Sequence, residues 1–548
     1  MGVSVDGTVL LPALLPVIGL VLVLVVDLVV PRLRRAPYAV AGLASLATVA
    51  ATVPGLGLGG GSARETFCLT SATVMTPTCL WQADALTSTL QLAAALSAAV
   101  CIALAWPGRV SGRAGTPADT GATAAPEATR EPVEAVLLLA ALTGTVVVAA
   151  SRDVGTWLVA LELATLPVIV LVALSGRRSA VAGATQLLVT SLVSFALLVL
   201  GVALWFAATG SPFLTADAVL GSESFASVSQ AASQSGGGGW VAYAPLTGSL
   251  APGTSVTLPV LGLAVVLVLV GLGFKLSLVP FHTWTPTAYS GASTPIAAFL
   301  ATVSKVAALA ALLVVVRAVT SLGGPALWTV AVLAALSMTV GNLLALRQDD
   351  VVRLLAWSTV AQAGWVVLPL VSVSALGIGA SATYLLTYVV ATLVAFAVVA
   401  VTVRERADGR QITAYDGLWH RSPWRAGALV LALTSLAGLP PGVIGLVGKI
   451  AALRPVVAEG WLWLAVIAAV NAVLGVAVYL RWLRGVITAP EALDGPDGPD
   501  GPDGPDAPAA VDDGDLVRRR MAAIALVVAA AVLVAVSVQP DLLLRLLG

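Results

Sequence analysis

Three lysines lie within long apolar runs, where a charge is costly. They are Lys275, Lys305 and Lys449, and the remaining basic residues of the chain are arginines placed in loops or near the ends of apolar runs. An arginine stays charged inside a protein, whereas a lysine removed from water can release its proton. Each lysine at the centre of a membrane costs roughly 2.5–3.5 kcal/mol, which a purely structural role seldom justifies. The pattern predicts that these lysines transfer protons.

One carboxylate has a similar position. Glu162 lies eight residues into the apolar run 154–175. A lone carboxylate at that depth needs a cationic partner or a water-filled cavity, and the three lysines are the candidate partners. For Lys275 and Lys449, which lie closer to the ends of their runs, the alternative is a side chain that extends to the membrane surface. Lys305 is midway along its run, so this alternative is weaker there.

Two apolar runs contain helix-breaking residues beside a lysine. The run 257–279 leads into Pro280 and His282, and the run 424–452 contains Pro440 and Pro441. Proline removes a helix donor, so both helices are predicted to be discontinuous, as in transporter ion sites built on inverted repeats. His282 lies within the first break and is a candidate proton relay, with ordinary hydrogen-bonded packing as the alternative.

The composition indicates whether the elements that position these residues lie in water or in a membrane. The chain has 548 residues, of which 59% are hydrophobic and 10% charged, with a mean hydropathy of +1.00. These values predict a polytopic membrane protein. The net charge of zero argues against nucleic acid. Three cysteines and two histidines far apart in sequence predict no metal site. Cys68 and Cys79 share one loop and are candidates for a disulfide.

Fourteen apolar runs are long enough to cross a membrane, where a span needs about 20 residues and must be helical. Most arginines fall on one side of the alternating loops, which predicts that both termini lie outside. The fold expected is an all-α polytopic membrane protein with two inverted-repeat halves and discontinuous helices 7 and 12. The runs are 8–30, 37–58, 85–107, 133–151, 154–175, 180–208, 257–279, 292–318, 324–346, 351–373, 376–403, 424–452, 458–485 and 519–546.

The residues around these lysines resemble a known family. The stretches Glu162-Leu-Ala-Thr-Leu-Pro167, Phe274-Lys275-Leu-Ser-Leu-Val-Pro280-Phe-His282-Thr-Trp284-Thr-Pro286 and Phe299-Leu-Ala-Thr-Val-Ser-Lys305 are similar to the antiporter-like membrane subunits of proton-translocating NADH-quinone oxidoreductase, the bacterial complex I, and to its subunit N in particular. Further matches are Gly341-Asn342, Gly438-Leu-Pro440-Pro441 and Gly448-Lys449. The resemblance covers about 150–485 closely and the flanking spans by pattern.

The resemblance implies a division of the chain and of the chemistry. Residues 1–131 would hold three N-terminal spans, 132–318 the first antiporter-like repeat, 319–485 the second, 486–517 a disordered Asp-Gly-Pro linker, and 518–548 the last span. Glu162, Lys275, Lys305 and Lys449 would carry protons, driven by quinone reduction in other subunits. No cofactor is expected in this chain; quinone, flavin and iron–sulfur clusters would belong to partner membrane and peripheral subunits. The location implied is the bacterial inner membrane.

Three positions differ from the family pattern. Gln186 stands where a lysine is usual, Thr287 where an acidic residue is usual, and Gln362 where a histidine is frequent. Two alternative functions therefore remain at this point. One is a subunit of a multi-subunit Na+/H+ antiporter or of a related ion-pumping complex with a donor other than NADH. The other is a structural membrane scaffold in which the lysines only form ion pairs.

Overall fold

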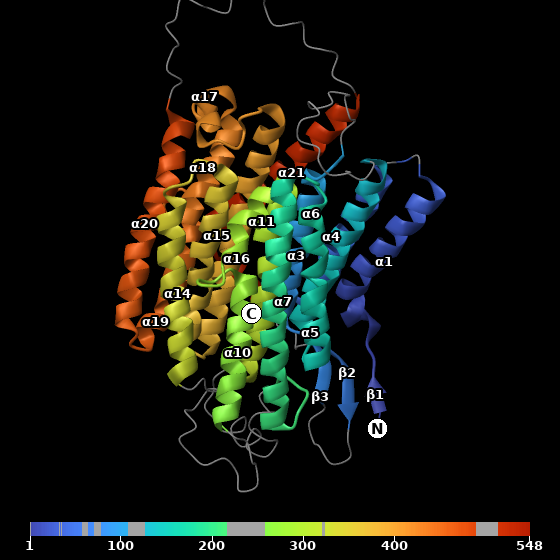
Figure 1. Ribbon diagram of the computed structural model, residues 1–548, viewed down its shortest axis with the longest axis vertical. Helices are drawn as coiled ribbons and strands as arrows, with labels where there is room; N and C mark the ends of the chain where they lie inside the picture. Colours follow the sequence, from blue (N-terminus) through green and yellow to red (C-terminus); the bar gives the residue numbers. More distant parts are fainter. Residues whose placement is uncertain are drawn as a thin grey trace, which may run out of the picture.

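Long apolar helices run side by side along the length of the molecule (Figure 1). The computed structural model describes residues 2–31, 33, 35–56, 64–70, 78–107, 127–215, 258–319, 324–488 and 513–547. The helices of the first half of the chain are α1 (Gly7–Val29), α2 (Ala36–Thr52), α3 (Ala85–Leu104), α4 (Glu127–Ala150), α5 (Val154–Leu163), α6 (Leu166–Ala173), α7 (Arg178–Thr209), α10 (Leu258–Leu276), α11 (Trp284–Gly291), α12 (Thr294–Ala301) and α13 (Val303–Ala318).

The second half continues the bundle. Its helices are α14 (Gly324–Ala345), α15 (Val351–Val367) with the 3-10 turn η4 (Leu368–Val371), α16 (Ala375–Glu405), α17 (Leu418–Arg421), α18 (Pro423–Ala437), α19 (Val443–Ala458), α20 (Leu462–Ile487), α21 (Asp513–Val538) and α22 (Asp541–Leu546). The helix α16 packs against α18, α19 and α21, and α13 is buried almost completely between α3, α4 and α10. These buried helices form the centre of the molecule.

Thirteen helices in the described part of the chain are long and apolar enough to cross a membrane. They match thirteen of the fourteen predicted runs. The remaining run, 424–452, is divided between α18 and α19, each of which is shorter than a full span. The chain is therefore a multi-pass, mostly helical protein, and the total of fourteen spans stays a prediction.

The two predicted breaks are present and have opposite orientations. After α10 ends at Leu276, an irregular turn leads into α11, and α18 ends at Ala437 before α19 begins at Val443. In Figure 1 α10 lies in the lower part of the bundle with α11 above it, whereas α18 lies in the upper part with α19 below it. The carboxyl ends of α10 and α18 thus meet the middle of the bundle from opposite sides, as inverted repeats require.

Two further breaks were not predicted. The run 154–175 is divided at Ala164 and Thr165 into α5 and α6, and Pro167 in the first turn of α6 explains the interruption. The run 292–318 is divided at Thr302, whose φ and ψ of −117° and −77° depart from helical values. Lys305 therefore lies in the first turn of α13. Its place near the middle of the span Thr294–Ala318 agrees with the prediction, but the expectation of one continuous helix there was wrong.

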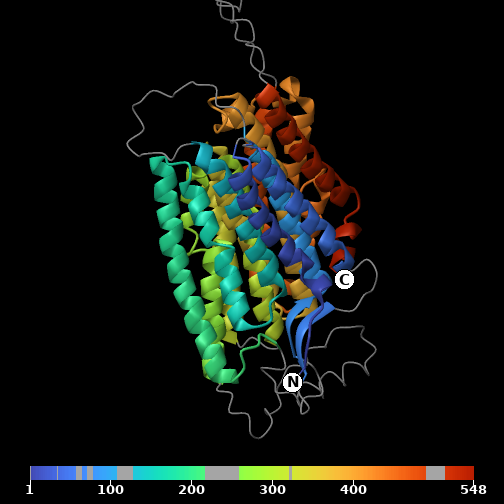
Figure 2. The same ribbon diagram turned by 90° about the vertical axis from the view of Figure 1, so that its right-hand side faces the viewer.

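A small antiparallel sheet at one end of the bundle was also not predicted. It contains β1 (Gly2–Ser4), β2 (Arg64–Thr70) and β3 (Thr78–Ala83) in that order. Cys68 and Cys79 are paired across β2 and β3 and form a disulfide, which confirms that candidate. The C-terminal segment reaches the same end, because the Thr89 hydroxyl, near the start of α3, donates to the Leu546 carbonyl at 2.5 Å. Figure 2 shows the sheet and both termini toward the lower part of the bundle.

Candidate functional site

Glu162 and Lys275 form an ion pair inside the bundle. The Lys275 Nζ lies 3.0 Å from Glu162 Oε1 and donates a second hydrogen bond of 2.8 Å to the Thr165 hydroxyl. Thr165 is available because the chain breaks between α5 and α6 at this level. Lys275 is 9% exposed, so its ammonium faces the interior and does not extend to the membrane surface. The predicted partnership of Glu162 with a lysine is therefore present in the structure.

Lys305 is bound to the broken end of α10. Its Nζ donates to the Lys275 carbonyl at 2.9 Å and to the Ser277 hydroxyl at 2.5 Å. Ser277 has a left-handed backbone with φ of 69°, which turns the chain away from the helix and leaves the last carbonyls without helical donors. The ammonium also lies 4.7 Å from the centre of the Trp284 ring. A cation at this position is favoured by the negative carboxyl end of the helix dipole and by the ring.

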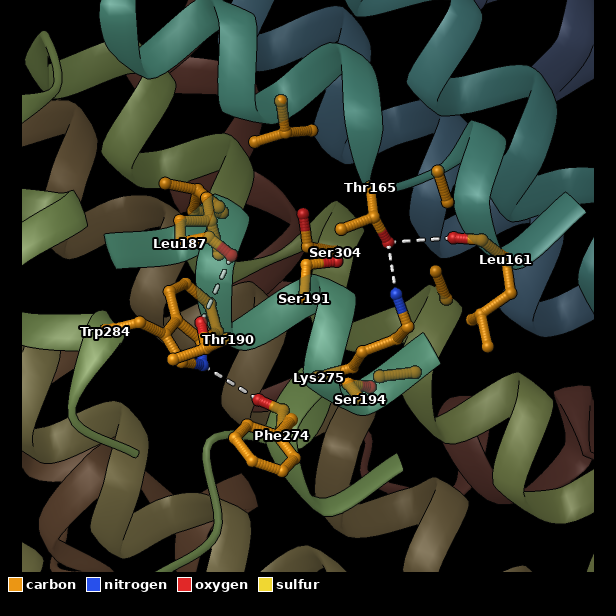
Figure 3. A pocket seen from close by; sticks show the side chains of 15 residues that line it. Leu161, Thr165, Leu187, Thr190, Ser191, Ser194, Phe274, Lys275, Trp284 and Ser304 are labelled. Carbon is orange, nitrogen blue, oxygen red and sulfur yellow. Dashed lines mark hydrogen bonds between the residues drawn. The ribbon is translucent and has the colours of Figure 1, made fainter. Parts of the chain in front are cut away.

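A small cavity lies beside the hydrogen-bonded side chains of Lys275 and Thr165 (Figure 3). Its volume is about 40 Å³, and its lining includes Lys275, Thr165, Ser191 and Ser304. The hydroxyl oxygens of Ser191 and Ser304 are buried and make no hydrogen bond within the described residues. One water needs roughly 10–15 Å³ by the same measure. The cavity is thus large enough and polar enough for a few waters next to the lysine.

Lys449 occupies the equivalent place in the second half. It is 7% exposed, and its Nζ donates at 2.5 Å to the carbonyl of Ala437, the last residue of α18. The ammonium lies 5.5 Å from the centre of the Trp365 ring. Gly438, with φ of 78°, allows the lysine side chain to approach closely, since a Cβ there would lie 2.9–3.3 Å from it. Lys305 and Lys449 therefore both hold the carboxyl end of a half-helix and both lie near a tryptophan.

An uncharged network lies at the end of α18 that binds Lys449. The Gln362 amide donates to Tyr479 Oη at 2.9 Å and to the Leu436 carbonyl at 3.3 Å, and it accepts a hydrogen bond from Tyr384 Oη. Leu436 directly precedes the carbonyl that binds Lys449. All these groups are buried. In the sequence Gln362 is distinguished only by its difference from the family pattern, because the tyrosines that it joins come from distant helices.

His282 is placed in the predicted break but not in the lysine cluster. Its ring packs against Trp357 of α15, with ring centres 5.2 Å apart. In the described part of the chain, no hydrogen bond or ion pair joins His282 to Lys275, Lys305 or Lys449. The buried Nδ1 of His282 also has no hydrogen-bond partner within the described residues, so its role as a proton relay stays a prediction.

The two positions that lack the usual charges contact each other. The Thr287 hydroxyl of α11 donates to Gln186 Oε1 of α7 at 2.7 Å. The family resemblance implies a lysine and an acidic residue at these positions. A neutral hydrogen bond therefore stands where the family pattern would place an ion pair, and this relation could not be inferred from positions 101 residues apart in sequence.

A partly buried ionic cluster lies at the end of the bundle that carries the sheet. Asp84 caps α3 by accepting from Thr87 N at 2.8 Å and forms an ion pair with Arg317. Burial raises the pKa of Asp84, but the charges of Arg317 and Arg152 outweigh this and lower it to about 2. Burial and Arg317 lower the pKa of Arg152 to about 10. Asp84 and Arg152 therefore stay charged at neutral pH, and the cluster joins α3, α13 and the α4–α5 connection.

The structure offers one grouping of metal-ligating side chains in its described residues, which is Glu65 with Cys68 and Cys79. The two cysteines are joined in the disulfide, so their sulfur atoms are not free thiolates. The grouping does not fit a metal site.

The fold and the buried lysines are those of a class of membrane proteins. The family model described as NADH:quinone oxidoreductase/Mrp antiporter, transmembrane, matches residues 151–475. This range covers more than half of the chain and includes every candidate relay residue. The chain belongs to this family.

Individual relatives agree with the family match. The chain is 39% identical to NADH-quinone oxidoreductase subunit N of Salinispora tropica, over 87% of this chain and 84% of the relative. It is 36% identical to NADH-quinone oxidoreductase subunit N 2 of Streptomyces griseus, over 89% and 84%.

Solved structures show the same fold. A chain of respiratory complex I from Thermus thermophilus superposes with a TM-score of 0.68 at 27% identity, covering 97% of this chain and 98% of that chain. A chain of the Mrp complex from Dietzia superposes with a TM-score of 0.71 at 22% identity, covering 99% and 96%. The second likeness concerns the fold alone.

Proposed function

We propose that this chain is a proton-translocating membrane subunit of an NADH-quinone oxidoreductase of the complex I type. It would contain no redox centre, and quinone, flavin and iron–sulfur clusters would belong to partner subunits of the assembly. Protons would pass through a relay of Glu162, Lys275, Lys305 and Lys449. The relatives named subunit N support this assignment.

The observation that carries the proposal is the contact between the two first-half lysines. The Lys275 ammonium is held by Glu162 and Thr165, while its backbone carbonyl accepts from Lys305. Both side chains can hold or release a proton. The cavity with the Ser191 and Ser304 hydroxyls supplies a place for water next to Lys275. His282 is a further candidate for this relay, with its ring packed against Trp357.

The division into repeats at 132–318 and 319–485 is part of the proposal. It is supported by the parallel placement of Lys305 on α10 and of Lys449 on α18. The linker at 486–517 lies largely outside the described residues. Each repeat would form half of the path across the membrane.

Substitution of Lys305 tests the relay. Lys305→Arg keeps the charge but removes a releasable proton, so redox-driven proton uptake by vesicles containing the complex should fall about a hundredfold. Lys305→Ala should also block uptake, and both variants should assemble. Near-normal uptake with Lys305→Arg would remove Lys305 from the path. Assembly lost with Lys305→Ala and kept with Lys305→Arg would instead indicate a scaffold.

The family description also covers antiporters, so a Na+/H+ antiporter subunit is the second candidate. The two differ in their driving force. Sodium-dependent proton movement in vesicles without an electron donor would favour the antiporter and contradict the proposal.

We also propose the bacterial inner membrane as the location, with both termini outside. The Cys68–Cys79 disulfide lies at the end of the bundle that carries both termini, and disulfides persist in oxidising compartments. A single cysteine introduced at residue 240 should react with an impermeant thiol reagent in intact cells, whereas one at residue 500 should not. The reverse result would invert the topology.

A further inference from the structure

A cavity rich in arginine lies where three helices end together, away from the lysines. It is bounded by the end of α16, the start of α18 and the first turns of α21, and its volume is about 270 Å³. Four arginines and one carboxylate line it: Arg404, Arg425, Arg518, Arg519 and Glu405. The lining thus has a marked excess of positive charge, in a chain whose net charge is zero.

The Glu405 carboxylate accepts hydrogen bonds from only one of these arginines among the described contacts. Glu405 accepts hydrogen bonds from both terminal nitrogens of Arg425, with 2.8 Å for Nη2. The Nε atoms of Arg425 and Arg518 are buried and have no acceptor among the described residues. Buried guanidinium donors without an acceptor are costly. An anion in the cavity would satisfy them.

The position of the cavity defines the kind of anion. The apolar spans Ala375–Glu405 and Leu516–Val538 reach the cavity with their ends, so it lies at the boundary of the bilayer. Trp424 lines it and is 49% exposed, and tryptophan is enriched at that boundary. The amino end of α18 adds the positive end of a helix dipole. Val401, Ala522 and Ala523 give the cavity an apolar side.

From these observations we infer that the cavity binds the phosphate of an anionic phospholipid headgroup. Arginine forks bind phosphate oxygens in pairs, and basic pockets between membrane helices at the bilayer surface suit anionic headgroups. The apolar side would contact the upper part of the acyl chains. This site is separate from the lysine relay and does not depend on the proposed function.

Native mass spectrometry of the purified, delipidated complex tests the site. Titration with phosphatidylglycerol should give saturable binding, and titration with phosphatidylcholine should not. Arg518→Gln should weaken binding about fivefold, the value for one arginine near an anionic surface. Arg353→Gln is the matched control, because Arg353 is exposed at the amino end of α15 and does not line the cavity. It should leave binding unchanged.

Three outcomes would overturn the inference. Equal weakening by Arg518→Gln and Arg353→Gln would mean a general attraction of charge. Displacement of the lipid by an equal concentration of inorganic phosphate would mean a site for a free anion. The third is binding that occurs only after the aspartates of the 494–506 repeat are changed to asparagine. In that case the acidic segment of this chain would be the ligand.

Discussion

The two halves of the molecule hold a lysine in the same way but surround it differently. In the first half Lys305 binds the end of α10 beside the charged pair of Lys275 and Glu162. In the second half Lys449 binds the end of α18 beside the neutral amide of Gln362. In the first half the lysines therefore lie next to a carboxylate, Glu162, which can itself gain or lose a proton. In the second half the neighbouring amide of Gln362 only donates and accepts hydrogen bonds.

The turns after the half-helices differ in a related way. The left-handed residue after α10 is Ser277, whose hydroxyl is a direct acceptor for Lys305. The left-handed residue after α18 is Gly438, whose missing side chain leaves room for Lys449. A left-handed residue thus follows the half-helix in both halves. In the first half its side chain binds the lysine, and in the second half its lack of a side chain leaves room for the lysine. An inverted repeat can preserve geometry while its electrostatics diverge.

The largest difference between the halves is expected from removal of the countercharge. Glu162→Gln should lower redox-driven proton uptake about a hundredfold, because Lys275 then lacks its carboxylate. Gln362→Leu should lower uptake less and mainly reduce thermal stability, by about 1–3 kcal/mol for buried hydroxyls left without a partner. Uptake in vesicles and thermal melting of each purified variant measure the two effects.

Glu459→Gln is the matched control for Glu162, since this residue at the end of α19 accepts only from Ser372 among the described contacts. It should pump normally. If Gln362→Leu abolished proton uptake at unchanged stability, uptake would depend on Gln362 as much as on Glu162. The distinction between a charged first half and a neutral second half would then be wrong.

A smaller effect is expected at the turn beside Lys449. Gly438→Ala forces a side chain into a left-handed residue, at a cost of about 1–2 kcal/mol, and places its Cβ against the lysine. Gly427→Ala inside α18, the helix that Gly438 follows, is the control, because a Cβ there meets nothing within 4 Å. Thermal melting should fall for the first variant and stay level or rise for the second. Equal effects would show that Lys449 does not need the open turn.

The smallest effect concerns the neutral pair of Gln186 and Thr287. Gln186→Lys or Thr287→Asp alone places an unpaired charge near the membrane and should lower stability. The double variant should recover about 0.5–3 kcal/mol through the restored ion pair. Thermal melting of the wild type and the three variants gives this coupling. Additive effects on stability would mean that the two side chains do not interact.

The sequence by itself determined the membrane class, thirteen helices that are long and apolar enough to span a bilayer, the two broken helices and the candidate relay residues. It could do so because a bilayer requires long apolar helices and makes buried charge conspicuous. It missed the break at Thr302, where neither proline nor glycine marks the interruption, and the break between α5 and α6, although Pro167 stood there.

Only the tertiary structure decided which groups meet. Of the three lysines, Lys275 is the one that pairs with Glu162, and Lys305 binds the Lys275 carbonyl. Gln362 forms hydrogen bonds with tyrosines from two other helices. His282, which the sequence placed within the first break, packs on Trp357. The physical reason is that hydropathy fixes how deep a residue lies in the membrane, whereas its neighbours depend on the rotation and pairing of helices distant in the chain.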